Sequence, residues 1–146
     1  ATSYPSMMRR QGAQQAMEDA GIRFEDKLYG LSNYDFESAY HAMNGLLARR
    51  AEFTALFAMS DVIAFGAIRA LVSAGLRVPE DVSVIGFDGI TMSRYCVPVM
   101  TTIVQPSEQI ALQSIELLVR QIEHGTPAQT VTLQPELQQG ESVRAI

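Results

Sequence analysis

The chain has 146 residues, of which 47% are hydrophobic and 18% are charged, and its formal net charge is −5. This length and composition predict one compact domain with a substantial core, because typical domains contain about 100 to 200 residues. The acidic balance argues against a chain that itself grips the phosphate backbone of a nucleic acid, which requires a basic face. Any contact with DNA would have to come from a domain outside this sequence.

The sequence favours a protein of a reducing compartment. No run approaches the roughly 18 uninterrupted apolar residues of a membrane span, and the N-terminus has no apolar secretory core. The single Cys96 cannot form an internal disulfide, and His41 and His124 lie too far apart in sequence to suggest a zinc site. We expect a cytoplasmic protein without metal, cofactor or membrane contact. An export signal cleaved from a longer precursor is the open alternative.

Helical periodicity, with apolar residues repeating every three or four positions, marks four segments. Gly21 ends the first, and Ser60 or Asp61 caps the third. Pro106 starts the fourth at its first helical position, and Gly125 ends it. The third segment is apolar almost all round, which predicts packing on more than one side. The expected helices span about residues 7–20, 35–50, 60–73 and 106–124.

Short apolar runs between these helices indicate strands. The run before Asp88 contains Val82, Val84 and Ile85 without polar alternation, which is typical of a strand covered on both faces. The expected strands are residues 27–31, 53–58, 82–86, 101–104, 130–133 and 137–143. Because strands alternate with helices, we predict an α/β fold with a doubly wound parallel sheet.

The last helix carries an apolar stripe. Burial of its larger side chains is worth roughly 1.5 to 3 kcal/mol each, so a bare stripe would be a sizeable exposed patch. We expect the stripe to cover a sheet that this chain does not contain. The alternative is a helix that folds onto the chain's own sheet. The stripe consists of Ala111, Ile115, Leu118 and Ile122.

Polar side chains follow three of the expected strands, at residues 32–34 (Ser-Asn-Tyr), residues 59–61 (Met-Ser-Asp) and Asp88. Because the carboxyl ends of parallel strands meet at one edge of a sheet, these turns are expected to line one crevice. An aromatic ring, hydroxyls and a carboxylate suit a sugar or another polyol, which offers C–H faces and hydroxyl donors. For Asp88, a turn role beside Gly89 is an equally good interpretation from spacing alone.

The sequence gives little support to an enzyme. It contains no Gly-x-Ser-x-Gly elbow, no Walker loop and no Gly-x-Gly-x-x-Gly motif. Cys96 has no histidine within its own segment, and His41 lies on an expected helix. A small α/β enzyme with Asp88 as general base would lack a second convergent acid or nucleophile. We therefore expect no catalysis.

The stretch from Gly75 to Pro106 resembles the effector-binding domain of the lactose-repressor/galactose-repressor family of bacterial transcription regulators. The likeness extends more loosely from about Arg9 to the C-terminus. One departure is Gly140, near the end of the expected final strand, where the family usually carries a basic residue. The matching motifs are GLRVPEDVSVIGFD (residues 75–88), Arg94-Tyr95, Pro98, MTTI (residues 100–103) and Gln105-Pro106.

The resemblance implies a periplasmic-binding-protein-like domain of two α/β lobes joined by three crossovers. By this analogy residues 1–106 form the distal lobe, without its first strand and helix. Residues 107–133 supply a helix and a strand of the proximal lobe, and residues 134–146 form the returning C-terminal strand.

The resemblance also implies roles for particular residues. Arg9 would clamp an oxygen or phosphate of the ligand, Tyr34 would stack, and Ser60 and Asp88 would complete the effector contacts, with Asp61 capping the helix. A solvated Arg9 and a Tyr34 that is plain core are the alternatives. Lobe pairing in a homodimer is expected at Arg94, Tyr95 and Cys96, unless this loop merely turns the chain between strands.

These implications lead to one expected function. The chain would be the effector-sensing and dimerisation region of a transcription regulator, bind a sugar-like molecule, and reach DNA only through a separate helix-turn-helix domain. A periplasmic sugar-binding protein of a transport system is the rival. Against it stand the Thr101-Thr102-Ile103 and Gln105-Pro106 pairing and the lack of an export signal.

Overall fold

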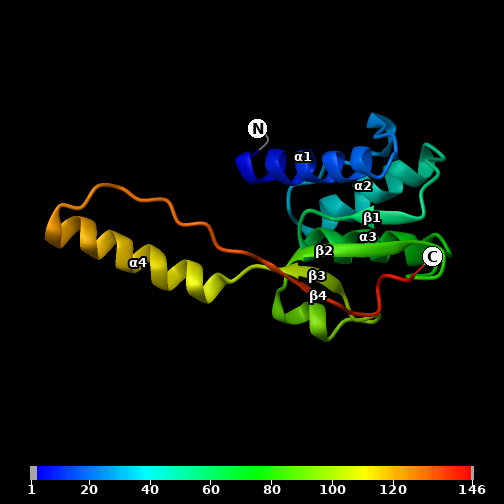
Figure 1. Ribbon diagram of the computed structural model, residues 1–146. Coiled ribbons are helices and arrows are strands. Elements are labelled where there is room, and N and C mark those ends of the chain that lie inside the picture. The colour runs from blue at the N-terminus through cyan, green and yellow to red at the C-terminus, as the bar shows by residue number, and fades with distance from the viewer. Residues whose placement is uncertain (1–2, 146) are drawn as a thin grey trace.

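In the computed structural model, which describes residues 3–145, one four-stranded sheet holds the chain together (Figure 1). The strand order is β1-β2-β3-β4; the first three strands are parallel and β4 is antiparallel to β3. The parallel sheet was expected, and the antiparallel edge strand is the addition. The strands are β1 (Ala55–Phe57), β2 (Ser83–Asp88), β3 (Thr101–Val104) and β4 (Glu136–Gln138).

Helices α2 (Phe36–Ala48) and α3 (Asp61–Ser73) pack against each other, and α3 also packs against β2. The expected packing of α3 on more than one side is confirmed. A Cβ at Gly66 would overlap the backbone of α2 at Phe36. Leu71 of α3, Val84 of β2 and Met100 are fully buried at the centre of the core. The small residues of α3 therefore serve the contact with α2.

The N-terminal helix α1 (Tyr4–Asp19) begins three residues earlier than expected, because the Ser3 hydroxyl accepts a hydrogen bond from the Ser6 N–H and Pro5 fits the first turn. Gly21 follows with a φ of 71°, as its helix-ending role predicts. Figure 1 shows α1 and α2 on the β1 side of the sheet. This position brings one face of α1 close to the strand ends.

Helix α4 (Ser107–His124) projects away from the sheet, and the chain returns beside it to β4 (Figure 1). Pro106 is the residue before the helix rather than its first residue, and Gly125 ends it in the left-handed conformation, as predicted. None of its residues is buried, and Ile115, Leu118 and Ile122 are 62%, 56% and 73% exposed. The alternative that α4 folds onto the chain's own sheet is therefore wrong.

Two expected strands do not form. Residues 27–31 contain a 3-10 turn, η1 (Asp26–Leu28), and then an extended segment that pairs with no strand of the described chain. Residues 130–133 lie on the return path beside α4, and β4 occupies only three residues. A strand needs a partner that supplies hydrogen bonds, and neither segment lies next to one.

Gly140 has a steric reason for lacking a side chain. Its N–H donates a hydrogen bond of 3.0 Å to the Thr101 hydroxyl, and a Cβ at this position would overlap the backbone at Val99 and Met100. Ser142 then donates to the carbonyl of Val84 at 2.6 Å and accepts from the N–H of Thr101. The returning chain is thus fastened to the body of the fold.

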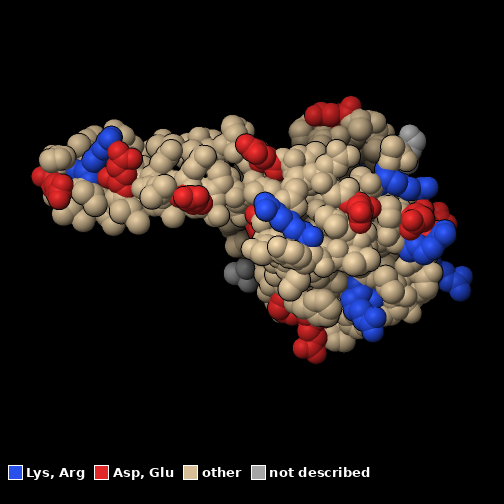
Figure 2. All heavy atoms as spheres, turned by 90° about the horizontal axis from the view of Figure 1, so that it is seen from below, with Lys and Arg blue, Asp and Glu red and all other residues tan. Residues whose placement is uncertain are grey.

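The outer surface has no broad basic region on the face that Figure 2 shows, where Lys and Arg side chains lie among acidic and uncharged ones. Such a surface does not suit a phosphate backbone. Among residues 3–145 no helix is long and apolar enough to cross a membrane.

Candidate functional site

The strand ends meet at one edge of the sheet, as the sequence predicted for the turns after 53–58 and 82–86. Arg9 of α1 reaches both: its Nη1 donates to the carbonyl of Met59, just after β1, and its Nη2 lies 3.5 Å from Oδ1 of Asp88, the last residue of β2. The guanidinium also covers the ring of Phe87, with 3.7 Å from Cζ to the ring centroid. Arg9 is therefore a bridge between strand ends and not a solvated helix residue.

Asp88 is held from a neighbouring strand end. Gln105, which follows β3, donates from its side-chain amide to Asp88 Oδ1 at 2.7 Å and from its backbone N–H to the Asp88 carbonyl at 3.1 Å. Burial raises the pKa of Asp88, while the hydrogen bond from Gln105 and the charge of Arg9 act in the opposite direction. The side chain remains 28% exposed, so the carboxylate is still accessible at this edge.

Two candidate residues have unusual backbone conformations. Tyr34 has a φ of 59° and Asp88 a φ of 115°, and Arg50 is the only other non-glycine with positive φ within residues 3–145. Such conformations are uncommon for side chains with a Cβ and tend to occur where the surroundings fix them for function. Both residues lie in turns that the sequence assigned to ligand contact.

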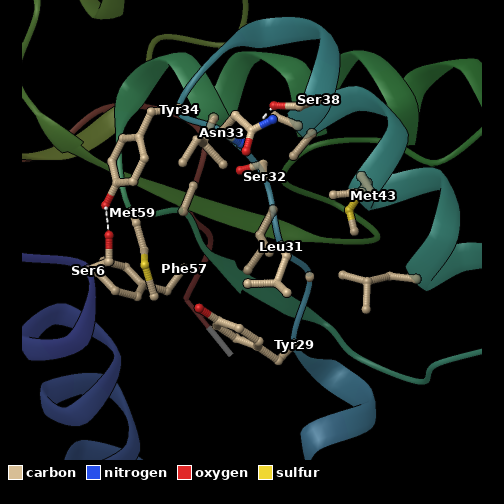
Figure 3. Close-up of a pocket in the computed structure, with 18 of the residues that line it drawn as sticks. Ser6, Tyr29, Leu31, Ser32, Asn33, Tyr34, Ser38, Met43, Phe57 and Met59 are labelled. Carbon is tan, nitrogen blue, oxygen red and sulfur yellow. Dashed lines mark hydrogen bonds between the residues drawn. The ribbon is translucent and has the colours of Figure 1, made fainter. Parts of the chain in front are cut away.

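Tyr34 is linked to the site by a contact with α1. Its hydroxyl shares a hydrogen bond of 2.9 Å with Ser6, which lies three residues before Arg9 on the same helix. The tyrosine side chain is partly exposed and is not a core residue. Figure 3 shows Tyr34 and Ser6 facing each other, and both residues line a cavity.

The cavity has a volume of about 600 Å³ and lies between the extended segment 28–34 and β1, with α2 and α3 behind it. Leu31, Met43 and Phe57 give it apolar walls, whereas Ser32 and Asn33 add polar groups (Figure 3). Of the four predicted contact residues only Tyr34 lines it. Arg9 does not line the cavity, but it donates to the carbonyl of Met59, which does. Asp88 lies at the adjoining edge of the sheet, in contact with Arg9.

Ser60 has the capping role that the resemblance assigned to Asp61, and Asp61 has a role that the resemblance did not imply. Ser60 caps α3, because its hydroxyl accepts the Ile63 N–H at 3.2 Å, and only 3% of Ser60 is exposed. Asp61 does not cap the helix. Its fully buried carboxylate accepts a 2.5 Å hydrogen bond from the Thr102 hydroxyl and a 2.8 Å bond from the Ile90 N–H. Asp61 therefore fixes the loop that follows Asp88.

The structure thus brings Arg9 and Asp88 into direct contact and joins Tyr34 to them through Ser6, whereas the Ser60 hydroxyl is used by its own helix. Sequence reasoning missed Gln105 as part of the site. Its role depends on the register of the sheet, in which Val104 pairs with Asp88, so that the next residue lies at the same edge.

The predicted pairing residues lie on a separate surface. Arg94 ends the 3-10 turn η2 (Thr91–Arg94) and donates from Nε to the Gln138 side chain, and Tyr95 is 77% exposed. Cys96 instead turns inward, where its thiol donates to the Ser93 and Pro98 carbonyls, and burial raises its pKa. Across the described residues no group of three His, Cys, Asp or Glu is arranged to hold a metal ion.

Comparison with known proteins identifies this arrangement. A model of the periplasmic binding protein-like domain matches residues 1–143. The chain belongs to this family. Among curated relatives, the HTH-type transcriptional regulator MalR of Clostridium butyricum is 39% identical over 94% of this chain and 41% of its own length. The chain spans about two fifths of the curated relatives that it matches.

Solved structures agree with this membership. The transcriptional regulator CelR in complex with cellobiose has a TM-score of 0.89 and 34% identity, over 94% of this chain and 42% of that one. A sugar-binding regulator of the LacI family from Escherichia coli, complexed with phosphate, has a TM-score of 0.88 and 33% identity, over 97% and 51%. The expected family resemblance and the α/β class are therefore confirmed. These relatives are regulators of transcription and not enzymes.

Proposed function

We propose that this chain is the effector-binding part of a LacI-type transcription regulator and that its ligand is a small, sugar-like molecule. The observation that carries the proposal is the Asp88 carboxylate, which Gln105 and Arg9 hold at the edge where the parallel strands end. Ligands of open α/β sheets bind at this edge. A cavity with hydroxyl and aromatic groups adjoins it.

In the proposed complex Asp88 accepts hydrogen bonds from ligand hydroxyls, and Tyr34 stacks against a C–H face of the ligand. Arg9 holds both strand ends in place and offers the outer side of its guanidinium to a ligand oxygen. Ser60 lies beneath this edge and fixes the start of α3, since its hydroxyl accepts the Ile63 N–H. The cellobiose bound by CelR supports a sugar as the ligand class.

We further propose that two copies pair through the surface around Arg94, Tyr95 and Cys96. Its support is the cluster of exposed apolar side chains beside Arg94, where Met92 is 59% and Val97 is 93% exposed. In that role Cys96 shapes the loop from within. Isologous pairing of the same surface in both copies is the common arrangement of homodimers.

The arm formed by α4 supports the proposed division into lobes. Residues 1–106 would be the distal lobe and residues 107–133 part of the proximal lobe, with residues 134–146 returning to the distal lobe. The bare stripe on α4 would then lie against the sheet of the proximal lobe. Ligand binding between lobes would favour one arrangement, and only a differential affinity for two arrangements can move a DNA-binding domain.

We place the regulator in the cytoplasm, with DNA contact through a separate domain and without catalysis. The rival role in transport is disfavoured by the relatives, which are HTH-type regulators. The gene separates the two: a helix-turn-helix segment ahead of this sequence supports regulation, and a signal peptide there would refute it.

The ligand assignment is tested by calorimetric titration of the full-length gene product with cellobiose, lactose, ribose and related sugars. The sugar that binds should lose at least tenfold in affinity in Asp88→Ala, since a charge-assisted hydrogen bond contributes about 1.5 to 3 kcal/mol. Asp19→Ala, an exposed carboxylate at the far end of α1, is the matched control. Unchanged sugar affinity in Asp88→Ala would refute the assignment.

A further inference from the structure

The candidate site contains one cation and one accessible anion, and they contact each other. Arg9 Nη2 lies 3.5 Å from Asp88 Oδ1, and their side chains are only 16% and 28% exposed. The neighbouring Arg10 points elsewhere, to Asp26 at 3.0 Å and over the ring of Tyr29. Within the described chain, the second carboxylate that acts on Asp88 is the buried Asp61. The part of the site that this chain supplies therefore has no surplus positive charge.

Each terminal nitrogen of Arg9 already has one partner, out of the five N–H donors that a guanidinium carries. Nη1 donates to the Met59 carbonyl, Nη2 faces Asp88, and one face of the guanidinium lies on the ring of Phe87. A phosphate or carboxylate normally takes two parallel hydrogen bonds from an arginine fork. Here an anion that used the remaining N–H groups would lie beside the Asp88 carboxylate, which repels it.

The adjoining cavity adds no charge. Its walls are built from apolar residues, serines, an asparagine and two tyrosines, and none of its lining residues is Lys, Arg, Asp or Glu. Its polar groups can exchange hydrogen bonds with hydroxyls, but none of them can neutralise an ionised ligand.

Asp88 itself offers one oxygen. Oδ1 already accepts the Gln105 amide at 2.7 Å, whereas no hydrogen bond from residues 3–145 reaches Oδ2. A free carboxylate oxygen attracts a hydroxyl donor and repels a second anion. Because this oxygen lies beside Arg9, the pair can bind the hydroxyl groups of an uncharged ligand.

From these contacts we infer that the site selects an uncharged polyhydroxy ligand and discriminates against the phosphorylated or carboxylated form of the same molecule. The inference rests on the proposed function for the identity of the site. Of the two ligand groups that the resemblance allowed at Arg9, it favours an uncharged oxygen over a phosphate. Arg9 donates to a ligand oxygen, while the Asp88 carboxylate balances its charge.

The inference can be tested without knowing the effector, by titrating the 146-residue chain with inorganic phosphate at pH 7.5 and following the side-chain NMR signals of Arg9. The unaltered chain should show no saturable shift at Arg9. In Asp88→Asn the side chain keeps its shape and loses its charge, so the affinity of Arg9 for phosphate should rise at least about tenfold.

Asp26→Asn is the matched control, because it releases Arg10 in the same way and leaves Arg9 paired. It should not change the phosphate response of Arg9. Saturable binding of phosphate at Arg9 in the unaltered chain, or no gain in Asp88→Asn, would overturn the inference. Circular dichroism of each variant establishes that it is folded.

A second measurement separates this inference from the proposed function. The full-length gene product is titrated with glucose and glucose 6-phosphate, and with ribose and ribose 5-phosphate. Tighter binding of either phosphate than of its parent sugar would refute the charge selection and leave a sugar-responsive regulator. Binding of neither form and of no sugar in the earlier panel, combined with the expected phosphate response of Asp88→Asn, would refute the sugar assignment and leave the charge balance intact.

Discussion

The body of the fold (residues 3–106 and 136–145) and the arm (α4 and residues 125–135) treat the same kind of side chain in opposite ways. In the body, α3 buries Leu71 completely between α2 and the sheet. In the arm, α4 has a regular helix and a proper Gly125 ending, yet Leu118 is 56% exposed. An amphipathic pattern thus predicts a helix, but only the tertiary neighbours decide whether its apolar face is covered.

The largest expected effect comes from truncating one leucine in each region. Leu71→Ala should lower the free energy of unfolding by about 2 to 5 kcal/mol, because it leaves a cavity in a packed core. Leu118→Ala should change it by less than about 0.5 kcal/mol, as an exposed site does. Urea unfolding of the 146-residue chain measures both. A similar loss in the two variants would show that α4 is packed in solution and would break the comparison.

A smaller effect is expected where the returning chain joins the body. Gly140→Ala should destabilise the fold by about 1 to 3 kcal/mol, since the new Cβ overlaps the backbone of Val99 and Met100. Gly12→Ala is the control, because α1 has open space there and alanine favours helix by up to about 1 kcal/mol. Thermal unfolding monitored by circular dichroism compares them. If Gly140→Ala is as stable as the unaltered chain, the returning chain does not pack tightly against Val99 and Met100 in solution.

The smallest effect concerns Gln105, which lies between the last parallel strand of the body and the start of the arm. Gln105→Leu removes a hydrogen bond to the ionised Asp88, so the pKa of Asp88 should rise further above its ordinary value. Since protonated Asp88 is a poorer acceptor, sugar affinity should fall with acidification at a higher pH in the variant. Carboxyl NMR titration measures the pKa.

Gln109→Leu, four residues further along the chain on the exposed side of α4, is the control for Gln105→Leu. It should leave the titration of Asp88 unchanged. An equal pKa of Asp88 in both variants would mean that Gln105 does not position the carboxylate.

Local sequence signals predicted those parts of the fold that local contacts determine. Asp35 begins α2 by accepting the Ser38 N–H, Ser60 caps α3, and Gly125 ends α4. Residues 27–31 were predicted wrongly as a strand, because a short run of residues does not reveal whether a neighbouring strand exists. The exposure of α4 was expected only through the absence of a sheet for its stripe to cover.

The candidate site was partly predictable for the same reason. Asp88 and Arg9 were named from the strand end and from the family resemblance, and the structure places them in contact. The roles of Gln105 and Asp61 depend on the register of β2 and β3 and on contacts between residues far apart in the chain. No spacing rule along the sequence contains that information.

Asp61 also limits how this sequence can evolve. Its carboxylate is buried against Gly86, where any Cβ would collide with it, and it needs the Thr102 hydroxyl as a donor. A larger residue at 86 or an apolar residue at 102 would leave the charge crowded or without its partner, at a cost that a further change at 61 would have to offset. Positions 61, 86 and 102 should therefore mutate together in descendants of this protein and rarely one at a time.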